Sequence, residues 1–382
     1  MIKISDKADC CGCRACIQIC PCNCINFYVD EEGFSYPSIN TDKCVNCGLC
    51  EKVCPVLNQA RDAELKVSHL YAIKNCNEFI RKDSSSGGFF TSLAEYVLAS
   101  GGIIYGAAFD ENFTLNHCRV DNKEDLARLR GAKYLQSNIC DTFSQCKQDL
   151  KEDRLVLFTG TPCQISALAL FLGKEYEKLL RVEIVCHGVP SPMIFQDYLS
   201  EILPSGSIVK IVKFRDKKES WKKYHFTVTY DYCGYRKIYS ECVTESLYMK
   251  GFLSDMFIRP SCFKCPSKSF KSSSDFTIAD FWGQEYTFPD FDTDTGVSAV
   301  FAHTQKAKLI LSNLTDIIVE PRPIADFIEY NPSLVNSSNL TLKTNRFWRN
   351  YAKIGKVSES VLMASKLPLY YRILQKLIKI FK

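Results

Sequence analysis

The 382-residue sequence predicts a protein of mixed α+β and α/β class, in which a small cysteine-rich module precedes an α/β domain built on a mixed sheet. Three observations support this prediction. Cysteines recur at regular spacing within the first 55 residues, and they are the only internal repeat. Strand and helix patterns alternate from residue 84 onward, which is typical of parallel βαβ units. Beyond residue 208 the apolar residues alternate as in antiparallel strands.

Two cysteine runs share the spacing C-x2-C-x2-C-x3-C-P. The first run is Cys10, Cys13, Cys16 and Cys20, and the second is Cys44, Cys47, Cys50 and Cys54. This spacing is the bacterial ferredoxin signature, in which the fourth cysteine of each run ligates the other cluster. The sequence therefore predicts two 4Fe–4S clusters, one held by Cys10, Cys13, Cys16 and Cys54 and the other by Cys44, Cys47, Cys50 and Cys20. A zinc module is the alternative, but zinc sites rarely use three cysteines in succession at this spacing.

Length and composition bound the remaining possibilities. The chain is long enough for two to three domains, and 46% hydrophobic and 12% aromatic residues provide for a buried core. The net charge of +5 is too small to indicate nucleic-acid binding. The N-terminus has no signal-peptide pattern and no segment is apolar enough to span a membrane. The chain has 21 cysteines but neither a signal-peptide pattern nor a membrane span, which indicates a reducing compartment. We therefore expect a cytoplasmic protein.

The predicted organisation follows composition and pattern. The polar stretch 58–66 reads as a linker after the cysteine-rich module. An apolar helical stripe runs from Phe90 to Leu98, and strands are expected at 103–109, 155–158 and 181–185. Segments 224–230 and 236–242 form a predicted hairpin around Cys233 and Gly234. The expected domains are the module at 1–58, an α/β subdomain at 66–150, a cofactor domain at 151–350 and a tail at 351–382.

Four further cysteines are candidates for a third cluster. Cys163 and Cys186 each follow a predicted strand, and the carboxyl ends of neighbouring parallel strands share one sheet edge. Cys262 and Cys265 form a C-x2-C pair before Pro266. Together the four thiols suffice for a cubane. The alternative is unconnected core cysteines and a small zinc knuckle, since nothing in the sequence forces these segments together.

Seven short motifs in order give the chain a resemblance to a known family. They are SSSGGFF (84–90), GAKYLQS (131–137), TGTPC (159–163), CHGVPSP (186–192), FRDK (214–217), RPSCFKC (259–265) and DFWG (280–283). Over roughly residues 66–350 the sequence resembles the family of coenzyme F-420 hydrogenase/dehydrogenase β subunits, which includes a plant relative that reduces 7-hydroxymethyl chlorophyll. The resemblance implies FAD beside an iron–sulfur cluster, and it supports Cys163, Cys186, Cys262 and Cys265 as cluster ligands. The resemblance thus implies that the α/β domain after the cysteine-rich module binds the flavin.

Candidate flavin-binding residues lie within these motifs. Gly87 and Gly88 at a helix start would let backbone N–H groups approach a ligand closely. Ser85 and Ser86 would add hydroxyl donors, or only cap the helix. The remaining candidates are Lys133, Tyr134, Gln136, Ser137, Gly160, Thr161, Pro162, Asp280 and Trp282.

Two residues of these motifs, Lys133 and His187, would take part in catalysis. Lys133 would place a positive charge near the flavin, where it stabilises the reduced ring; the alternative is a solvated surface lysine. His187 would donate a proton, and the alternative is a packed, hydrogen-bonded histidine. Asp280 and Trp282 suit either a flavin wall or plain core.

The expected function is electron transfer between ferredoxin-type clusters and FAD, coupled to reduction or oxidation of an organic or deazaflavin-type small molecule. Neither a G-x-G-x-x-G fingerprint nor a phosphate-binding P-loop is present, so the fused module favours ferredoxin or a similar one-electron donor. The alternative is a non-catalytic electron-transfer subunit of a larger redox complex. The basic amphipathic tail from Pro368 suits either peripheral membrane contact or docking on its own domain, and self-association into a homo-oligomer is left open.

Overall fold

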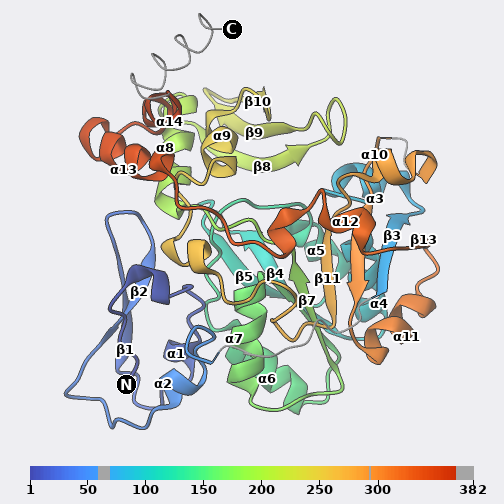
Figure 1. Ribbon diagram of the computed structural model, residues 1–382, viewed down its shortest axis with the longest axis horizontal. Coiled ribbons are helices and arrows are strands. Elements are labelled where there is room, and N and C mark those ends of the chain that lie inside the picture. The colour runs from blue at the N-terminus through green and yellow to red at the C-terminus, as the bar shows by residue number, and fades with distance from the viewer. Residues whose placement is uncertain (59–68, 292–293, 367–382) are drawn as a thin grey trace, which may run out of the picture.

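The computed structural model describes residues 1–58, 69–291 and 294–366 (Figure 1). The linker predicted at 58–66 falls almost entirely outside the described residues, and the basic tail from Pro368 does so completely. The described chain forms the N-terminal module, a large sheet covered by helices on both faces, and a smaller three-stranded sheet beside it.

The N-terminal module contains an antiparallel hairpin and three short helices. Strand β1 (Ile25–Val29) pairs with β2 (Ser35–Ile39), and η1 (Lys7–Asp9), α1 (Ala15–Gln18) and α2 (Leu49–Lys52) carry or flank the cysteine runs. Helices α1 and α2 each begin after a left-handed residue, Arg14 at φ 57° and Gly48 at φ 73°. The repeated cysteine spacing therefore produces the same local turn twice.

The large domain is built on an eight-stranded mixed sheet. In spatial order the strands are β13 (Ile317–Arg322), β3 (His69–Asn75), β12 (Ser298–Ala302), β11 (Phe276–Asp280), β7 (Leu179–Ile184), β6 (Val156–Gly160), β4 (Ile103–Phe109) and β5 (Leu115–Val120). Strands β11, β7, β6 and β4 are parallel, whereas β12, β13 and β5 pair antiparallel to their neighbours. The predicted mixed sheet is therefore confirmed.

Helices cover both faces of this sheet. Helices α4 (Phe89–Ala99), α5 (Lys123–Leu129) and α11 (Gln305–Asn313) pack on one face through residues such as Leu93 and Val97. Helices α6 (Thr142–Lys151) and α7 (Pro162–Leu172) pack on the other, and their core also includes Ala15 and Val53 of the module. The module therefore shares a hydrophobic core with α6 and α7 (Figure 1).

The smaller sheet has the order β10-β9-β8, with β8 at Ile208–Asp216, β9 at His225–Tyr232 and β10 at Tyr235–Cys242. The predicted hairpin around Cys233 and Gly234 is confirmed, because Tyr235 pairs with Tyr232. The remaining helices are α3 (Glu78–Asp83), α8 (Pro192–Ile202), α9 (Leu247–Leu253), η2 (Pro260–Lys264), α10 (Gln284–Thr287), η3 (Pro289–Phe291), α12 (Ala325–Ile328), η4 (Pro332–Leu334), α13 (Leu342–Ile354) and α14 (Val357–Ser365). Within the described ranges, no helix has both the length and the apolar character needed to cross a bilayer.

Candidate functional site

The first set of module cysteines gathers beside the large domain. The thiol of Cys16 lies close enough to Cys10 and Cys54 to interact electrostatically with both, and Cys54 interacts with Cys10. Cys13, Cys16 and Cys54 are buried, and burial, followed by the neighbouring Cys10, raises the pKa of Cys16 to about 12. A thiol binds metal only as the thiolate, so ligation here must release protons.

The second set lines one small cavity at the outer end of the module. Cys20, Cys44, Cys47 and Cys50 all border it, together with Cys22 and Cys24. Cys47 is exposed, and the buried Cys24 has its Sγ 3.4 Å from that of Cys20. The structure thus brings Cys20 of the first run to the second run, which is the crossed arrangement that the ferredoxin spacing predicts.

The third set converges at the carboxyl edge of the large sheet. Strands β6 and β7 are parallel neighbours, so Cys163 at the start of α7 and Cys186 after β7 occupy the same edge. Cys262 lies on η2 and Cys265 directly follows it. Cys186 interacts electrostatically with Cys262, Cys163 and Cys265, and burial raises its pKa well above the usual range. Burial likewise raises the pKa of Cys262 to about 12.

The chemistry of these donor sets fits 4Fe–4S clusters. Among the described residues, no three His, Cys, Asp or Glu side chains converge on a point where they would share one metal ion. A 4Fe–4S cluster instead requires four cysteine thiolates spread around a group of irons. Each of the three sets offers four such thiols.

Cys11 lies between the first and third sets, a position that sequence reasoning did not anticipate. Its buried thiol contacts the thiols of Cys13 and Cys163, which belong to different sets. The sequence signal was weak, because Cys11 falls outside the C-x2-C spacing. Only the packing of the module on α7 reveals it.

Arg259 and Gln136 complete this junction. The amide of Gln136 donates from Nε2 to the carbonyl oxygen of Cys11 at 3.1 Å, while its Oε1 accepts from Nη1 of Arg259 at 2.9 Å. Gln136 was a predicted flavin contact, but its described contacts are with the module and Arg259. Its flavin role stays a prediction.

The predicted serine and glycine loop follows α3 and leads into α4. Oγ of Ser85 accepts from the backbone N–H of Ala132 at 2.5 Å, and Ser86 donates from Oγ to the carbonyl of Val297 at 2.5 Å. A Cβ added to Gly87 would lie 2.3 Å from the carbonyl oxygen of Ile73. Gly88, at φ +88°, is the N-cap of α4. In the described chain, Ser85 and Ser86 therefore connect this loop to the segments of Ala132 and Val297.

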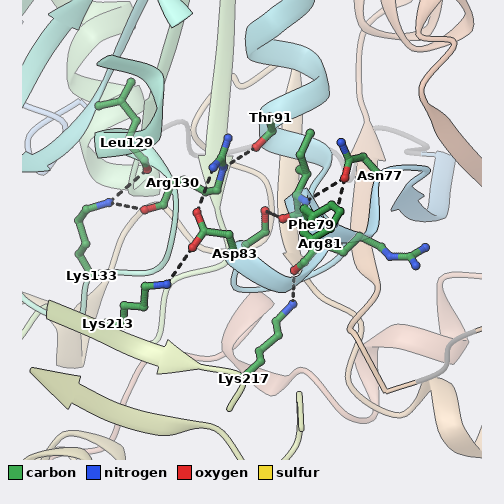
Figure 2. Close-up of polar contacts among 12 residues, drawn as sticks. Asn77, Phe79, Arg81, Asp83, Thr91, Leu129, Arg130, Lys133, Lys213 and Lys217 are labelled. Carbon is green, nitrogen blue, oxygen red and sulfur yellow. Dashed lines mark hydrogen bonds and ion pairs between the residues drawn. The ribbon is translucent and has the colours of Figure 1, made fainter. Parts of the chain in front are cut away.

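A group of cations surrounds this loop (Figure 2). Lys133 donates from Nζ to the carbonyl oxygens of Leu129, Arg130 and Gly131 at 3.0–3.2 Å. Lys133 is partly buried, and burial lowers its pKa to about 8; its role beside a flavin stays a prediction. Asp83 pairs with Arg130 at 3.0 Å and with Lys213 at 2.8 Å.

Lys217 of the FRDK motif anchors the loop from the smaller sheet. Its Nζ donates to the carbonyl oxygens of Arg81 and Ser86, each at 2.8 Å, and of Thr295 at 2.6 Å (Figure 2). These acceptors are backbone carbonyl oxygens of three separate segments, so the side chain holds those segments together. Sequence reasoning quoted the motif but assigned no role to this residue.

The other predicted contacts near β6 have defined packing roles. Tyr134 packs its ring against Phe252 with 4.9 Å between ring centres. Buried Ser137 accepts a 3.0 Å hydrogen bond from Gln164. Gly160 ends β6, Thr161 forms the capping box of α7 and Pro162 is its first residue. Oγ1 of Thr161 lies 3.3 Å from Sγ of Cys163, so this turn fixes a candidate cluster ligand.

Asp280 and Trp282 lie at the end of β11, on the same edge. Asp280 forms an ion pair with Arg215, whose side chain is 2% exposed. Burial opposes the charge of Arg215, but Asp280 outweighs it and the pKa of the guanidinium rises above its usual value. Trp282 stacks on Trp221 with ring centres 4.6 Å apart at an angle of 5°. The guanidinium also lies 5.0 Å from the Trp282 ring centre.

His187 lies next to Cys186 but faces another element. Its Nε2 is 2.7 Å from Oδ1 of Asp255, and its ring packs edge-on against Phe252 at 5.1 Å. This is the environment of a packed, partnered histidine. Its role as a proton donor stays a prediction.

An open cavity of about 560 Å³ is bordered by the residues on either side of Trp221 and by the start of α10. Its lining is mostly charged: Glu219, Ser220, Lys222, Lys223, Gln284, Glu285, Pro289 and Asp294. The volume is in the range of small-molecule sites. None of these residues was predicted from the sequence.

Two segments of the chain match models of known protein families. Residues 9–58 match the family model of the 4Fe–4S dicluster domain. Residues 153–325 match the family model of the carboxyl-terminal part of the coenzyme F420 hydrogenase/dehydrogenase β subunit.

Individual relatives are more distant. The chain is 26% identical to the coenzyme F420-dependent sulfite reductase of Methanocaldococcus jannaschii, over 52% of this chain and 30% of that protein. It is 23% identical to a subunit of the F(420)H(2) dehydrogenase of Methanosarcina mazei, over 45% of this chain and 51% of that protein. The alignments thus span about half or less of these curated relatives. A chain in the F420-reducing [NiFe] hydrogenase complex from Methanosarcina barkeri superposes with a TM-score of 0.47 at 18% identity, over 79% of this chain and 92% of that chain.

The clusters' donor sets, the mixed α/β fold and the two family matches lead to one classification. The chain is an iron–sulfur protein in which a 4Fe–4S dicluster domain precedes a domain that matches, over residues 153–325, the carboxyl-terminal part of the coenzyme F420 hydrogenase/dehydrogenase β subunit.

Proposed function

We propose that the chain is a ferredoxin-linked flavoprotein in which Cys163, Cys186, Cys262 and Cys265 hold a third 4Fe–4S cluster. Electrons would pass between the two module clusters, this third cluster and FAD, and then to or from an organic or deazaflavin-type substrate. The supporting observation is the convergence of four cysteines from three separate segments at the sheet edge next to the module. When bound, 4Fe–4S clusters transfer single electrons and FAD accepts one or two, which converts single-electron input into a two-electron reaction.

In this proposal the chain's regions divide the work. Residues 1–58 form the donor module, and residues 151–350 hold the third cluster and most of the flavin site. Residues 66–150 contribute the loop around Ser85 and the segment around Lys133. Residues 351–382 form the tail, whose described part comprises the end of α13 and all of α14.

Arg215 is the observation that favours a flavin at this edge. Its Nε and Nη2 are buried and have no hydrogen-bond partner among the described residues, although the same guanidinium pairs with Asp280. A buried donor without a partner costs about 1–3 kcal/mol, so a bound acceptor would satisfy it. The carbonyl-rich edge of a flavin is such an acceptor, and a cation there stabilises the anionic reduced ring. Arg215 thus fits the role that the sequence analysis gave to Lys133.

A non-catalytic electron-transfer subunit is the second candidate. It is favoured by the relative that is named as one subunit of a dehydrogenase. In that case the third cluster would pass electrons to a partner protein, and the isolated chain would turn over no organic substrate.

The deciding experiment is the iron-to-flavin ratio and visible spectrum of anaerobically purified protein. About 12 irons and one FAD per chain, from three clusters of four irons, would support the complete proposal. About 12 irons without flavin would favour the electron-transfer role. About eight irons without flavin would overturn both candidates, because only the module clusters would remain.

A further inference from the structure

We propose that Arg259 is a positioning residue that fixes the first module cluster against the third and sets the reduction potential of both. In this arrangement the second module cluster is the entry point, the first is the intermediate and the third is the exit toward the sheet edge. The inference rests on the proposed function, because it requires the third cluster.

The side chain of Arg259 ties the module to the large domain. It is fully buried, and it donates from Nε to the carbonyl oxygen of Cys10 at 2.6 Å. From Nη2 it donates to the carbonyl of Ser35, and from Nη1 to Oε1 of Gln136, each at 2.9 Å. Its guanidinium also lies 4.4 Å from the ring centre of Tyr36. One side chain therefore holds the first cysteine run and the hairpin of the module together.

The backbone of Arg259 is part of the third cysteine set. Its N–H donates to the carbonyl of Val189, in the segment that follows Cys186, at 3.0 Å, and its carbonyl accepts from the N–H of Cys262 at 2.9 Å. The residue thus connects the Cys186 and Cys262 segments through its backbone and Cys10 through its side chain. Any shift of the module would have to break the hydrogen bond between Arg259 and Cys10.

Gly12 shows how closely the two parts approach. A Cβ at this position would lie 2.3 Å from Nε2 of Gln136 and 2.8 Å from Nη1 of Arg259. Cys11, the residue before it, contacts the thiols of both Cys13 and Cys163. The first and third sets are therefore in side-chain contact through one intervening thiol.

The charge of Arg259 acts on both clusters. All three of its described hydrogen-bond acceptors are uncharged oxygens, so none of them neutralises the guanidinium. Its positive charge lies near Cys163 and Cys262. A cluster gains one negative charge on reduction, so a nearby buried cation stabilises the reduced form and raises the potential.

The order of the clusters follows from exposure. The second set borders a cavity at the outer end of the module, where Cys47 and the neighbouring Val45 are exposed. The first set faces Cys163. Each transfer oxidises one cluster by one electron and reduces the next by one, with no bond made or broken.

The test is an EPR-monitored redox titration of the full-length protein, with Arg259→Met and Arg259→Lys compared with wild type. In Arg259→Met we expect the potentials of the first and third clusters to become more negative and their magnetic interaction to weaken, while the second cluster is unchanged. In Arg259→Lys the charge remains but the forked contact is lost, so the interaction should weaken with a smaller shift in potential.

Arg14→Met is the matched control. Arg14 stacks on Phe27 at 4.7 Å and lies near Cys16 and Arg259, but it has no described contact with the third cysteine set, so its removal should shift the first cluster alone. If Arg259→Met binds full iron yet keeps both potentials and the interaction, the inference is wrong and the proposed function stands. If Arg259→Met fails to fold, an Arg259→Lys protein with wild-type magnetic interaction contradicts it equally. A wild-type protein with only two clusters overturns both the function and the inference.

Discussion

The hydroxyl of Thr277 on β11 donates a 2.5 Å hydrogen bond to Oε1 of Glu183 on β7, and both side chains are at most 2% exposed. Burial raises the pKa of Glu183 to about 7, although the hydrogen bond from Thr277 and the nearby hydroxyls of Ser272 and Ser274 oppose this change. The described molecule therefore keeps a titratable carboxyl between the two central strands.

This carboxyl makes stability depend on pH. Because its pKa is higher in the folded state, its contribution is fully present below about pH 4.5 and is lost as the pH rises through about 7. The free energy of unfolding falls by about 3 kcal/mol, because the pKa rises from 4.5 to about 7 on folding and each pKa unit corresponds to about 1.36 kcal/mol. We expect Glu183→Gln to flatten the fall of the melting temperature between pH 5 and pH 8. Exposed Glu124→Gln should keep the wild-type slope, and an unchanged slope in Glu183→Gln would contradict this account.

Cys163→Ala should remove one cluster and leave the two module clusters intact. We expect about eight irons per chain instead of about 12, because a 4Fe–4S cluster needs all four thiolates. Cys11→Ala is the control, since Cys11 contacts Cys163 but belongs to none of the three sets of four, and it should keep about 12. Equal iron content in the two variants, measured on anaerobic protein, would show that Cys163 is not a ligand.

Asp280→Asn should destabilise the protein by leaving the charge of Arg215 buried without its partner. Loss of one partner of a buried pair costs about 3–5 kcal/mol, and the 18% exposure of Asp280 places the expected effect at the lower end. The melting temperature of anaerobic protein measures it. Asp231→Asn removes a carboxylate from the exposed pair with Arg236 and should leave the melting temperature unchanged. Similar values for the two variants would argue against a structural role for the Asp280 pair.

Gly87→Ala distinguishes strand packing from ligand approach. The added Cβ would lie 2.3 Å from the carbonyl oxygen of Ile73 and 2.6 Å from the backbone nitrogen of Ser298, so β3 and β12 would have to separate. We expect lower soluble yield and melting temperature whether or not flavin is bound. Gly101→Ala meets no atom within 4 Å, and its φ of +69° should cost only about 1 kcal/mol. A Gly87→Ala protein that melts normally but binds no flavin would instead favour the ligand-approach role.

The sequence predicted those parts of the site whose position depends on local spacing. The strands before Cys163 and Cys186 could be recognised from their apolar runs, and a short βαβ connection makes them parallel neighbours. The smaller sheet was recognised from alternation in 224–230 and 236–242. Strands β12 and β13 were missed, because they join the sheet on the far side of β11 and no local turn signals their pairing.

The sequence did not reveal residues whose role depends on packing between distant segments. Arg259 and Cys10 are 249 positions apart, and no periodicity relates them. The sequence predicts Lys133 as a cation near the flavin, but it does not reveal that three carbonyl oxygens at positions 129–131 hold its ammonium. Arg215 was part of a quoted motif, yet its burial and its unpartnered donors become evident only when Asp280 and Trp282 are in place.

The hydrogen bonds of Arg259 to the module have a consequence for how this sequence can diverge. Both of its module acceptors, at Cys10 and Ser35, are main-chain carbonyl oxygens, which every amino acid supplies. Substitution of Ser35 would therefore leave this contact in place, whereas a side chain at Gly12 would obstruct it. Homologous chains can thus vary the surface residues of the hairpin while retaining the same attachment to the larger domain.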